Sequence, residues 1–336
     1  MRTAARTAAR TAARPAAHLA IPFAALLFGS GSASIADVPP IGHDVQGLQP
    51  AMLAPGFVST MDDDSHPTLS PDGRTLYFLK NTPTFDFWTI VESHWQGTGW
   101  GPIRTVSFSG QYPDGDLVFA GDGRHAFFVS SRPVDDKPRT DTEIWSIERT
   151  ASGWSAPRHV RELSSPGDEW FPTLTNDGSV VFGSTRDGGR GCDLYRAQWR
   201  NGKFEAPVNL GAPLNTAAEE IEAYVAPDES FIVFAAKGRP DSLGSYDIYV
   251  SERRGGKWLE PRHLGEPINS TGWDFSPRMT PDGRYFTFTS NRGFGSKPLE
   301  RRIEFAELQK KLRAPGNGLR DIYVVDRKAL GLPKSP

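Results

Sequence analysis

The sequence predicts an all-β fold, a β-propeller of five blades, and three features lead to this prediction. The chain of 336 residues contains 34 glycines and 28 prolines, a content that favours many turns over long helices. Five segments align on a turn aspartate, and neighbouring turn aspartates are 50 to 55 residues apart. Each segment carries about four short apolar runs in the same order. Repeats of this length and strand content are typical of propeller blades.

The first two strands of each repeat are predicted to form a hairpin, because Asp-Gly between alternating apolar runs is a strong hairpin signal. The turn aspartates are Asp72, Asp122, Asp177, Asp228 and Asp282, and the fourth is followed by Glu instead of Gly. The third strand begins with an acid, one residue and an aromatic side chain, as in residues 247–249 (Asp-Ile-Tyr). A turn with glycine then leads to an aromatic residue, a proline and a short fourth strand.

The two ends of the repeat region predict how the ring closes. The fifth repeat stops after its third strand near Arg327, whereas residues 50–53 (Pro-Ala-Met-Leu) match the fourth strand of other repeats. Pairing these segments would complete the last blade and remove an exposed sheet edge. We therefore predict a 3+1 closure by the N-terminal strand. Six blades are the alternative, which requires a further repeat that the sequence does not show.

Residues 1–36 are predicted to be a signal peptide. They contain four arginines and no acid, then an apolar run at 19–28, then small residues. An organellar transit peptide is the alternative, because Arg-Thr-Ala-Ala repeats precede the apolar run. We expect a periplasmic or secreted protein after cleavage. The rest of the chain is predicted to contain an N-terminal extension (37–49), the propeller (50–330, with an insertion at 296–318) and a tail (331–336).

The insertion in the last repeat is predicted to contain a helix over 298–313. Pro298 and Glu300 suit its first turn, and Lys310, Lys311 and Arg313 suit its last. Because the insertion follows the second strand of its repeat, it belongs to the face where the first strands begin. It is expected to cap the channel, to contact a partner, or to pack against the last blade.

Composition narrows the classes of partner. The formal net charge of −2 argues against nucleic acid as a partner, since a nucleic-acid binder needs a basic surface. No apolar run reaches the roughly 18 residues of a transmembrane helix. The single cysteine, Cys192, excludes an internal disulfide and a zinc site with several cysteines. We expect a monomer whose partner is an envelope protein or an oligosaccharide.

The repeats also carry a family resemblance. The pattern Ser/Thr-Pro-Asp-Gly, then Phe-x-Ser-x-Arg and Asp-Ile-Tyr, resembles the repeats of TolB-like periplasmic propellers, which are related to WD40-like repeats. The best matches are residues 171–189 and 276–293, and the resemblance extends over 50–327. Relatives with such repeats are often binding or scaffolding modules of the bacterial envelope, and others are domains of peptidases or polysaccharide-degrading enzymes. The resemblance therefore implies the fold more specifically than the function.

Each repeat places an acid eight residues before its turn aspartate, at the start of the strand that lines the channel of a propeller. These acids are Asp64, Asp114, Glu169, Glu220 and Asp274. Strand alternation puts His66, Asp116, Phe171, Glu222 and Ser276 on the same side, two residues further on. Basic residues after the second strand are expected at the same mouth, namely Arg132, Arg186, Lys237 and Arg292.

We predict that this acidic mouth binds a ligand through the five acids, His66, Trp170, Phe275, Arg132, Arg186 and Arg292. A structural role is the alternative for the acids, because each could accept hydrogen bonds from the amides or the arginine of its blade. A ring of oxygen ligands would suit Ca²⁺, the cofactor we consider, although no residue is assigned as a metal ligand.

The expected function is that of a ligand- or protein-binding module without catalysis. The alternative is a carbohydrate-active hydrolase or lyase that uses acids at the mouth, because glycoside hydrolysis needs two carboxylates at a set separation. In outline such a propeller resembles the arabinanase-type hydrolases, but no motif matches them position by position. No catalytic residue is assigned, and the sequence has no Gly-x-Ser-x-Gly elbow.

Overall fold

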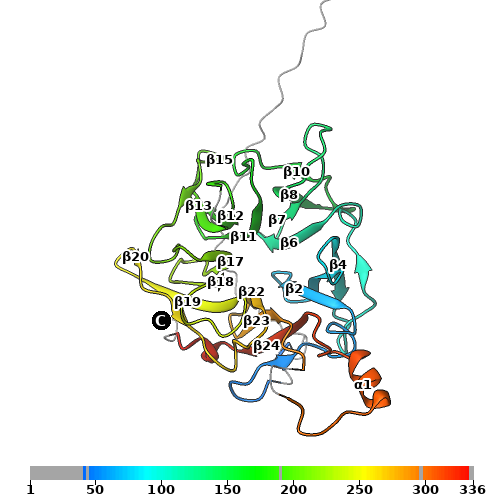
Figure 1. The fold of residues 1–336 in the computed structure, drawn as a ribbon. Coiled ribbons are helices and arrows are strands. Elements are labelled where there is room, and N and C mark those ends of the chain that lie inside the picture. The colour runs from blue at the N-terminus through cyan, green and yellow to red at the C-terminus, as the bar shows by residue number, and fades with distance from the viewer. Residues whose placement is uncertain (1–40, 43–44, 189–190, 295–297, 333–336) are drawn as a thin grey trace, which may run out of the picture.

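The computed structural model describes residues 41–42, 45–188, 191–294 and 298–332. Five antiparallel sheets form a ring, which confirms the all-β, five-bladed propeller (Figure 1). The predicted signal peptide, 1–36, lies outside the described residues, as do 37–40 of the N-terminal extension and 333–336 of the tail. Within the described residues, no helix is long and apolar enough to cross a membrane.

The first four blades each consist of three long strands and a short outer strand, in sequence order from the axis outward. Blade one has β2 (Asp63–Leu69), β3 (Thr75–Asn81), β4 (Trp88–His94) and β5 (Arg104–Thr105), and blade two has β6 (Asp114–Phe119), β7 (His125–Ser130), β8 (Glu143–Thr150) and β10 (Arg158–His159). Blade three has β11 (Glu169–Leu174), β12 (Val180–Ser184), β13 (Asp193–Ala197) and β16 (Val208–Asn209), and blade four has β17 (Glu219–Val225), β18 (Phe231–Lys237), β19 (Asp247–Arg254) and β21 (Arg262–His263).

Short hairpins extend three of these blades at the outer turn. Strand β9 (Gly153–Trp154) pairs with the end of β8, and β20 (Lys257–Trp258) pairs with the end of β19. In blade three, β14 (Trp199–Arg200) pairs with β15 (Lys203–Phe204). Each of these turns contains the glycine that the repeat pattern places before the aromatic residue.

The last blade confirms the predicted 3+1 closure. It contains β22 (Asp274–Met279), β23 (Tyr285–Ser290) and β24 (Asp321–Asp326), and its outer strand is β1 (Ala51–Met52). Ala51 lies opposite Val324 and Met52 opposite Tyr323. The backbone N–H of Leu53 donates a hydrogen bond to the carbonyl of Ile322 at 2.8 Å, which continues the pairing. The chain after β24 ends in a short 3₁₀ turn, η2 (Arg327–Leu330).

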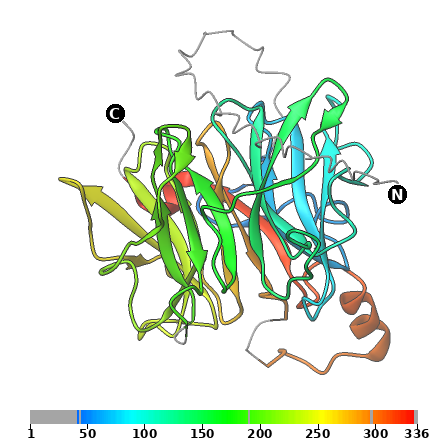
Figure 2. The same ribbon diagram turned by 90° about the horizontal axis from the view of Figure 1, so that it is seen from above.

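The hydrophobic core lies between neighbouring blades. Phe127 and Val129 of β7 pack with Phe182 of β12 and Tyr195 of β13, and similar clusters join the other blades. In Figure 2 the blades stand side by side, and their strands run between the two faces of the ring. This packing holds the ends of the inner strands in place on both faces.

The helix of the insertion is shorter than predicted. It is α1 (Phe305–Leu312), and Pro298 and Glu300 lie in the segment before it. None of its residues is buried, so no tertiary packing stabilises additional turns, and a short helix without packing is marginal in water. It stands off one face of the ring (Figure 2). Asn317 Nδ2 donates to the carbonyl of Met61 at 3.1 Å, which places the end of the insertion beside the start of β2.

Every inner strand contains a β-bulge at the same position, two residues after the mouth acid. The register shifts there in all five blades. The residues at the bulge are His66, Asp116, Phe171, Glu222 and Ser276, and their φ angles lie between 50° and 56°. Non-glycine residues rarely adopt such angles, and bulges commonly re-aim a side chain near a functional site. The contacts described next show that these residues meet across the blades.

Candidate functional site

Each of the five mouth acids lies within ion-pair distance of a basic residue at, or just after, the end of the second strand of the same blade. The nearest N–O distances are 2.7 Å for Asp64–Lys80, 2.6 Å for Asp114–Arg132, 3.2 Å for Glu169–Arg186, 2.9 Å for Glu220–Arg239 and 2.9 Å for Asp274–Arg292. All five carboxylate side chains are fully buried. In blade four the partner is Arg239 rather than Lys237, because β18 continues to Lys237, whose side chain is exposed.

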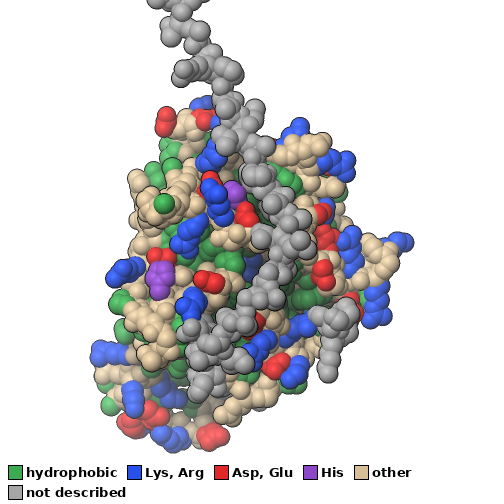
Figure 3. All heavy atoms as spheres, turned by 180° about the vertical axis from the view of Figure 1, so that it is seen from behind, with side chains coloured by type: hydrophobic (Ala, Val, Ile, Leu, Met, Phe, Trp, Pro, Cys, Tyr) green, Lys and Arg blue, Asp and Glu red, His purple; other side chains and the backbone are tan. Residues whose placement is uncertain are grey.

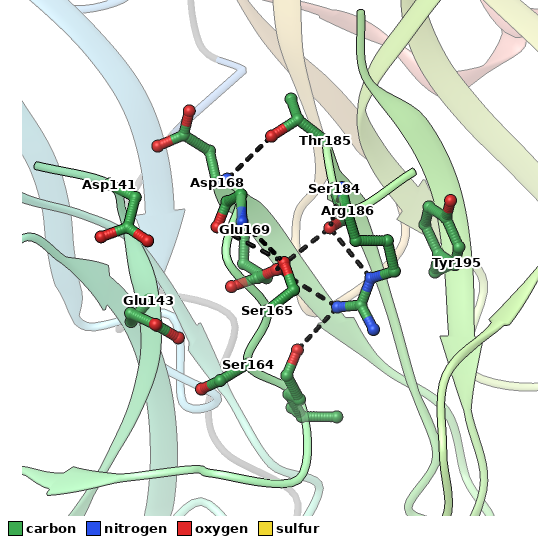
Figure 4. Close-up of polar contacts among 12 residues, drawn as sticks. Asp141, Glu143, Ser164, Ser165, Asp168, Glu169, Ser184, Thr185, Arg186 and Tyr195 are labelled. Atoms are coloured by element: carbon green, nitrogen blue, oxygen red, sulfur yellow. Dashed lines mark hydrogen bonds and ion pairs between the residues drawn. The ribbon is translucent and has the colours of Figure 1, made fainter. Parts of the chain in front are cut away.

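The arginines of these pairs also hold the loop that enters each blade. Arg186 Nη2 donates to the carbonyl of Leu163 at 2.7 Å, and Ser165 Oγ and Ser184 Oγ donate to Glu169 at 2.5 and 3.0 Å (Figure 4). Arg132, Arg239 and Arg292 donate in the same way to the carbonyls of Phe108, Leu214 and Ile268. Because these acids are enclosed and already paired, we assign them a structural role, and a ligand at the mouth would meet other groups.

The pair in blade three has an unusual electrostatic environment. Burial, together with the nearby carboxylate of Glu143, raises the pKa of Glu169 to about 8, although Ser165 and Arg186 oppose the shift. Glu143 lies on β8 and forms ion pairs with Arg139 and His159. Figure 4 shows the side chains of Glu143 and Glu169 facing the same space between blades two and three. Burial also raises the pKa values of Asp64 and Asp114.

Three titratable residues from the bulges of blades one, two and four meet at the channel axis. His66 Nε2 lies 3.3 Å from Glu222 Oε1 and 3.5 Å from Asp116 Oδ1. The second oxygen of each carboxylate is held by a bulge amide, since Ser276 N–H donates to Glu222 Oε2 at 2.7 Å and Phe171 N–H donates to Asp116 Oδ2 at 2.9 Å. All three side chains are almost fully buried. We call this group the channel cluster.

The charge of each residue in the channel cluster changes the pKa values of its neighbours. Burial alone would lower the pKa of His66, but the carboxylates of Glu222 and Asp116 more than offset it and raise that pKa. Burial raises the pKa of Asp116; the charge of His66 opposes this shift, and that of Glu222 adds to it. An imidazolium between two carboxylates therefore fits this site.

Aromatic rings form a continuous belt at the mouth above the channel cluster. Adjacent ring centroids are 6.2 Å apart for Trp170–Trp88, 5.6 Å for Trp88–Phe85, 6.2 Å for Phe85–His66, 5.5 Å for His66–Phe275, 6.5 Å for Phe275–Trp273 and 5.7 Å for Trp273–Tyr246. These seven residues, from four blades, are the aromatic belt. Trp273 is 40% exposed, whereas Phe275 and His66 are buried at its base.

The structure thus brings together His66, Trp170 and Phe275 of the predicted site, and adds residues that the prediction did not include. Phe85, Trp88 and Tyr246 come from the loops and strand starts after the second strands. A tryptophan or tyrosine beside a third-strand start is the signal that could have pointed to them. Among the described residues, no group of three or more His, Cys, Asp or Glu is arranged to hold a metal ion.

No family model matches the chain, and no curated protein matches it. Among solved structures, it is similar to a glycoside hydrolase, with a TM-score of 0.52, 10% identity, and coverage of 88% of this chain and 96% of that chain. The catalytic domain of an alpha-L-arabinofuranosidase from Coprinopsis cinerea gives a TM-score of 0.44, 13% identity, and coverage of 83% and 97%.

Hydrazine synthase from Kuenenia stuttgartiensis gives a TM-score of 0.43, 14% identity, and coverage of 79% of this chain. This chain spans 40% of the hydrazine synthase chain and 29% of prolyl oligopeptidase B from Galerina marginata. At these identities the likeness shows the fold alone, and the chain is a five-bladed β-propeller.

Proposed function

We propose that the protein is a carbohydrate-binding propeller of the TolB-like type, which binds an oligosaccharide at the aromatic belt. The observation that carries this proposal is the belt itself, a continuous set of rings from four blades around one channel mouth. Aromatic rings offer flat apolar faces beside polar groups, which suits the alternating apolar and hydroxyl surfaces of a sugar. Ligand sites of this kind are mainly apolar with a few convergent polar groups.

The polar groups beside the belt support the same ligand class. Lys237 Nζ is 5.5 Å from the centroid of the Tyr246 ring, and the guanidinium of Arg320 is 3.9 Å from that of Phe85. Lys237 ends β18 of blade four, and Arg320 directly precedes β24 of the neighbouring blade five. Export to the periplasm or beyond, by the predicted signal peptide, is part of this proposal.

Replacing Trp273 by alanine should weaken oligosaccharide binding at least tenfold, because it removes the most exposed ring of the belt. Isothermal titration of the full-length protein against arabino-, xylo-, cello- and chito-oligosaccharides measures the effect. Trp258→Ala is the matched control, since Trp258 lies in the outer hairpin of blade four and should leave Kd within twofold. The proposal is wrong if the folded protein binds none of these sugars, or if both variants lose affinity equally.

Hydrolysis of the bound sugar is a second candidate, and the channel cluster favours it. Two carboxylates share one imidazole nitrogen, and burial raises the pKa of Asp116, as expected for a general acid. If the cluster acts on sugars, the wild-type protein should release new reducing ends from a bound oligosaccharide. Asp116→Asn and Glu222→Gln should each reduce that rate by 100-fold or more, on the order of general acid–base catalysis. Binding without any release of reducing ends would leave the protein a binding module.

A further inference from the structure

The channel opens a second time on the face opposite to the aromatic belt. A cavity of about 420 Å³ lies there between the ends of the inner strands, within the range of small-molecule sites. Its walls include one apolar residue per blade, three positions before the turn aspartate: Leu69, Phe119, Leu174, Val225 and Met279. Figure 3 looks onto this face and shows hydrophobic side chains among charged ones near its centre.

Blade five places a charge at the floor of this cavity. Four positions before the turn aspartate, the other blades have Thr68, Val118, Thr173 and Tyr224, and blade five has Arg278, all of which line the cavity. Arg278 is 6% exposed, and its guanidinium lies 3.7 Å from the centroid of the Phe171 ring. Among the described lining residues Arg278 is the one cation, and the one anion is Asp282 in the turn at the outer edge.

The guanidinium of Arg278 has few hydrogen-bond partners for a buried cation. Its Nη1 donates to Thr173 Oγ1 at 3.1 Å and to the carbonyl of Pro172 at 3.4 Å, and Nη2 donates to the same carbonyl at 3.5 Å. Nε is buried and has no partner, and no carboxylate of the described residues lies within ion-pair distance. Burial lowers the pKa of Arg278 to about 10, although Asp116 opposes the shift. A buried cation normally has an anionic partner, because its desolvation is costly.

We propose that this cavity binds a medium-chain fatty carboxylate, with the carboxylate on Arg278 and the alkyl chain against the apolar walls. A guanidinium is well suited to a carboxylate, and Arg278 is the one cation among the described residues that line the cavity. The positions of Arg278 and Asp282 fix the orientation of the ligand, because the carboxylate of Asp282 at the outer edge would repel a carboxylate head group placed there. This site is separate from the aromatic belt and does not depend on the proposed oligosaccharide binding.

Decanoate, used below its micelle concentration, is the probe that tests this site on the full-length protein by isothermal titration. We expect decanoate to bind at least tenfold more tightly than decan-1-ol, and decylammonium not to bind, because Arg278 would repel it. Val118→Phe should weaken decanoate binding at least tenfold by filling the cavity. Val208→Phe is the matched control, since Val208 is exposed on β16, and it should leave Kd within twofold.

Two further variants test whether decanoate binds through Arg278 and at this mouth of the channel. Arg278→Met should remove the preference for decanoate over decan-1-ol, provided that circular dichroism shows a folded protein; if it does not fold, Val118→Phe decides. Trp273→Ala should not change decanoate binding, because Trp273 belongs to the opposite mouth. The proposal is overturned if the folded wild-type protein does not bind decanoate, if decan-1-ol binds equally well, or if Val118→Phe has no effect.

Discussion

Replacing Arg292 by alanine should lower the free energy of unfolding by about 3 kcal/mol or more, the scale for breaking a buried ion pair. Arg292 Nη2 lies 2.9 Å from Asp274 Oδ1, and the same guanidinium donates to the carbonyls of Pro267 and Ile268 at 2.9 and 2.5 Å. It also lies over the ring of Tyr323, 4.7 Å from the centroid. The variant leaves a fully buried carboxylate and two carbonyls without these donors, and the cost of such groups sets the size of the effect.

Urea denaturation of wild type and variant measures this loss, read as a shift in midpoint at constant slope. Arg284→Ala is the matched control, because Arg284 is 70% exposed and its Nε is 4.0 Å from Asp282. An exposed pair of this kind contributes about 0 to 1 kcal/mol. A loss below about 1 kcal/mol for Arg292→Ala would contradict the structural role that we give to the acid–base pairs.

The wild-type protein should lose stability as the pH rises, and replacing Glu169 by glutamine should remove this loss. The folded protein holds this carboxyl protonated up to a pKa of about 8, because of burial and the charge of Glu143, whereas the ordinary value is 4.5. Between these pH values the unfolded chain releases the proton and the folded chain retains it. The unfolded state then binds fewer protons, so the free energy of unfolding falls as the pH rises.

Melting temperatures at pH 5 and pH 8 test this expectation. The variant should melt several degrees higher than wild type at pH 8, and the two should be closer at pH 5, because 1 kcal/mol corresponds to roughly 2–4 °C in a domain of this size. The amide oxygen introduced by Glu169→Gln is expected to remain an acceptor for Ser165 and Ser184. Glu300→Gln, at an exposed position in the insertion, should leave the pH dependence unchanged. Parallel melting curves for wild type and Glu169→Gln would count against a raised pKa.

The architecture could be predicted because its signals are local and occur five times. Each turn aspartate marks a hairpin within a few residues, and the closing strand at residues 50–53 repeats a proline-led pattern found in other blades. The partner of Glu220 could not be predicted from alignment alone. The sequence aligns Lys237 with the arginines of other blades, but β18 extends to Lys237, and Arg239 therefore takes the equivalent place. The length of β18 therefore decides which basic residue pairs with Glu220, and the packing of the strand sets that length.

The candidate site was harder to predict because it depends on backbone geometry that the residue types do not mark. His66, Asp116 and Glu222 adopt left-handed angles without being glycine, so nothing in the sequence identifies the bulges. Their contacts join residues up to 156 positions apart, which only the closed ring brings together. Phe85 is a similar case, since its φ of 59° turns an aromatic residue of a loop over His66.

The pairing of β1 with β24 has a consequence for the order in which this chain can fold. Hairpins within each blade need only neighbouring residues, so the first four blades can form while the chain is still being synthesised. Blade five is different, because its outer strand is made first and its other strands are made last. The earliest segment must therefore wait for the end of the chain, and until then the partly built arc has a free edge on each side. Among the strand pairings of the described residues, the pairing of β1 with β24 spans the longest stretch of sequence, and it is the natural last step of assembly.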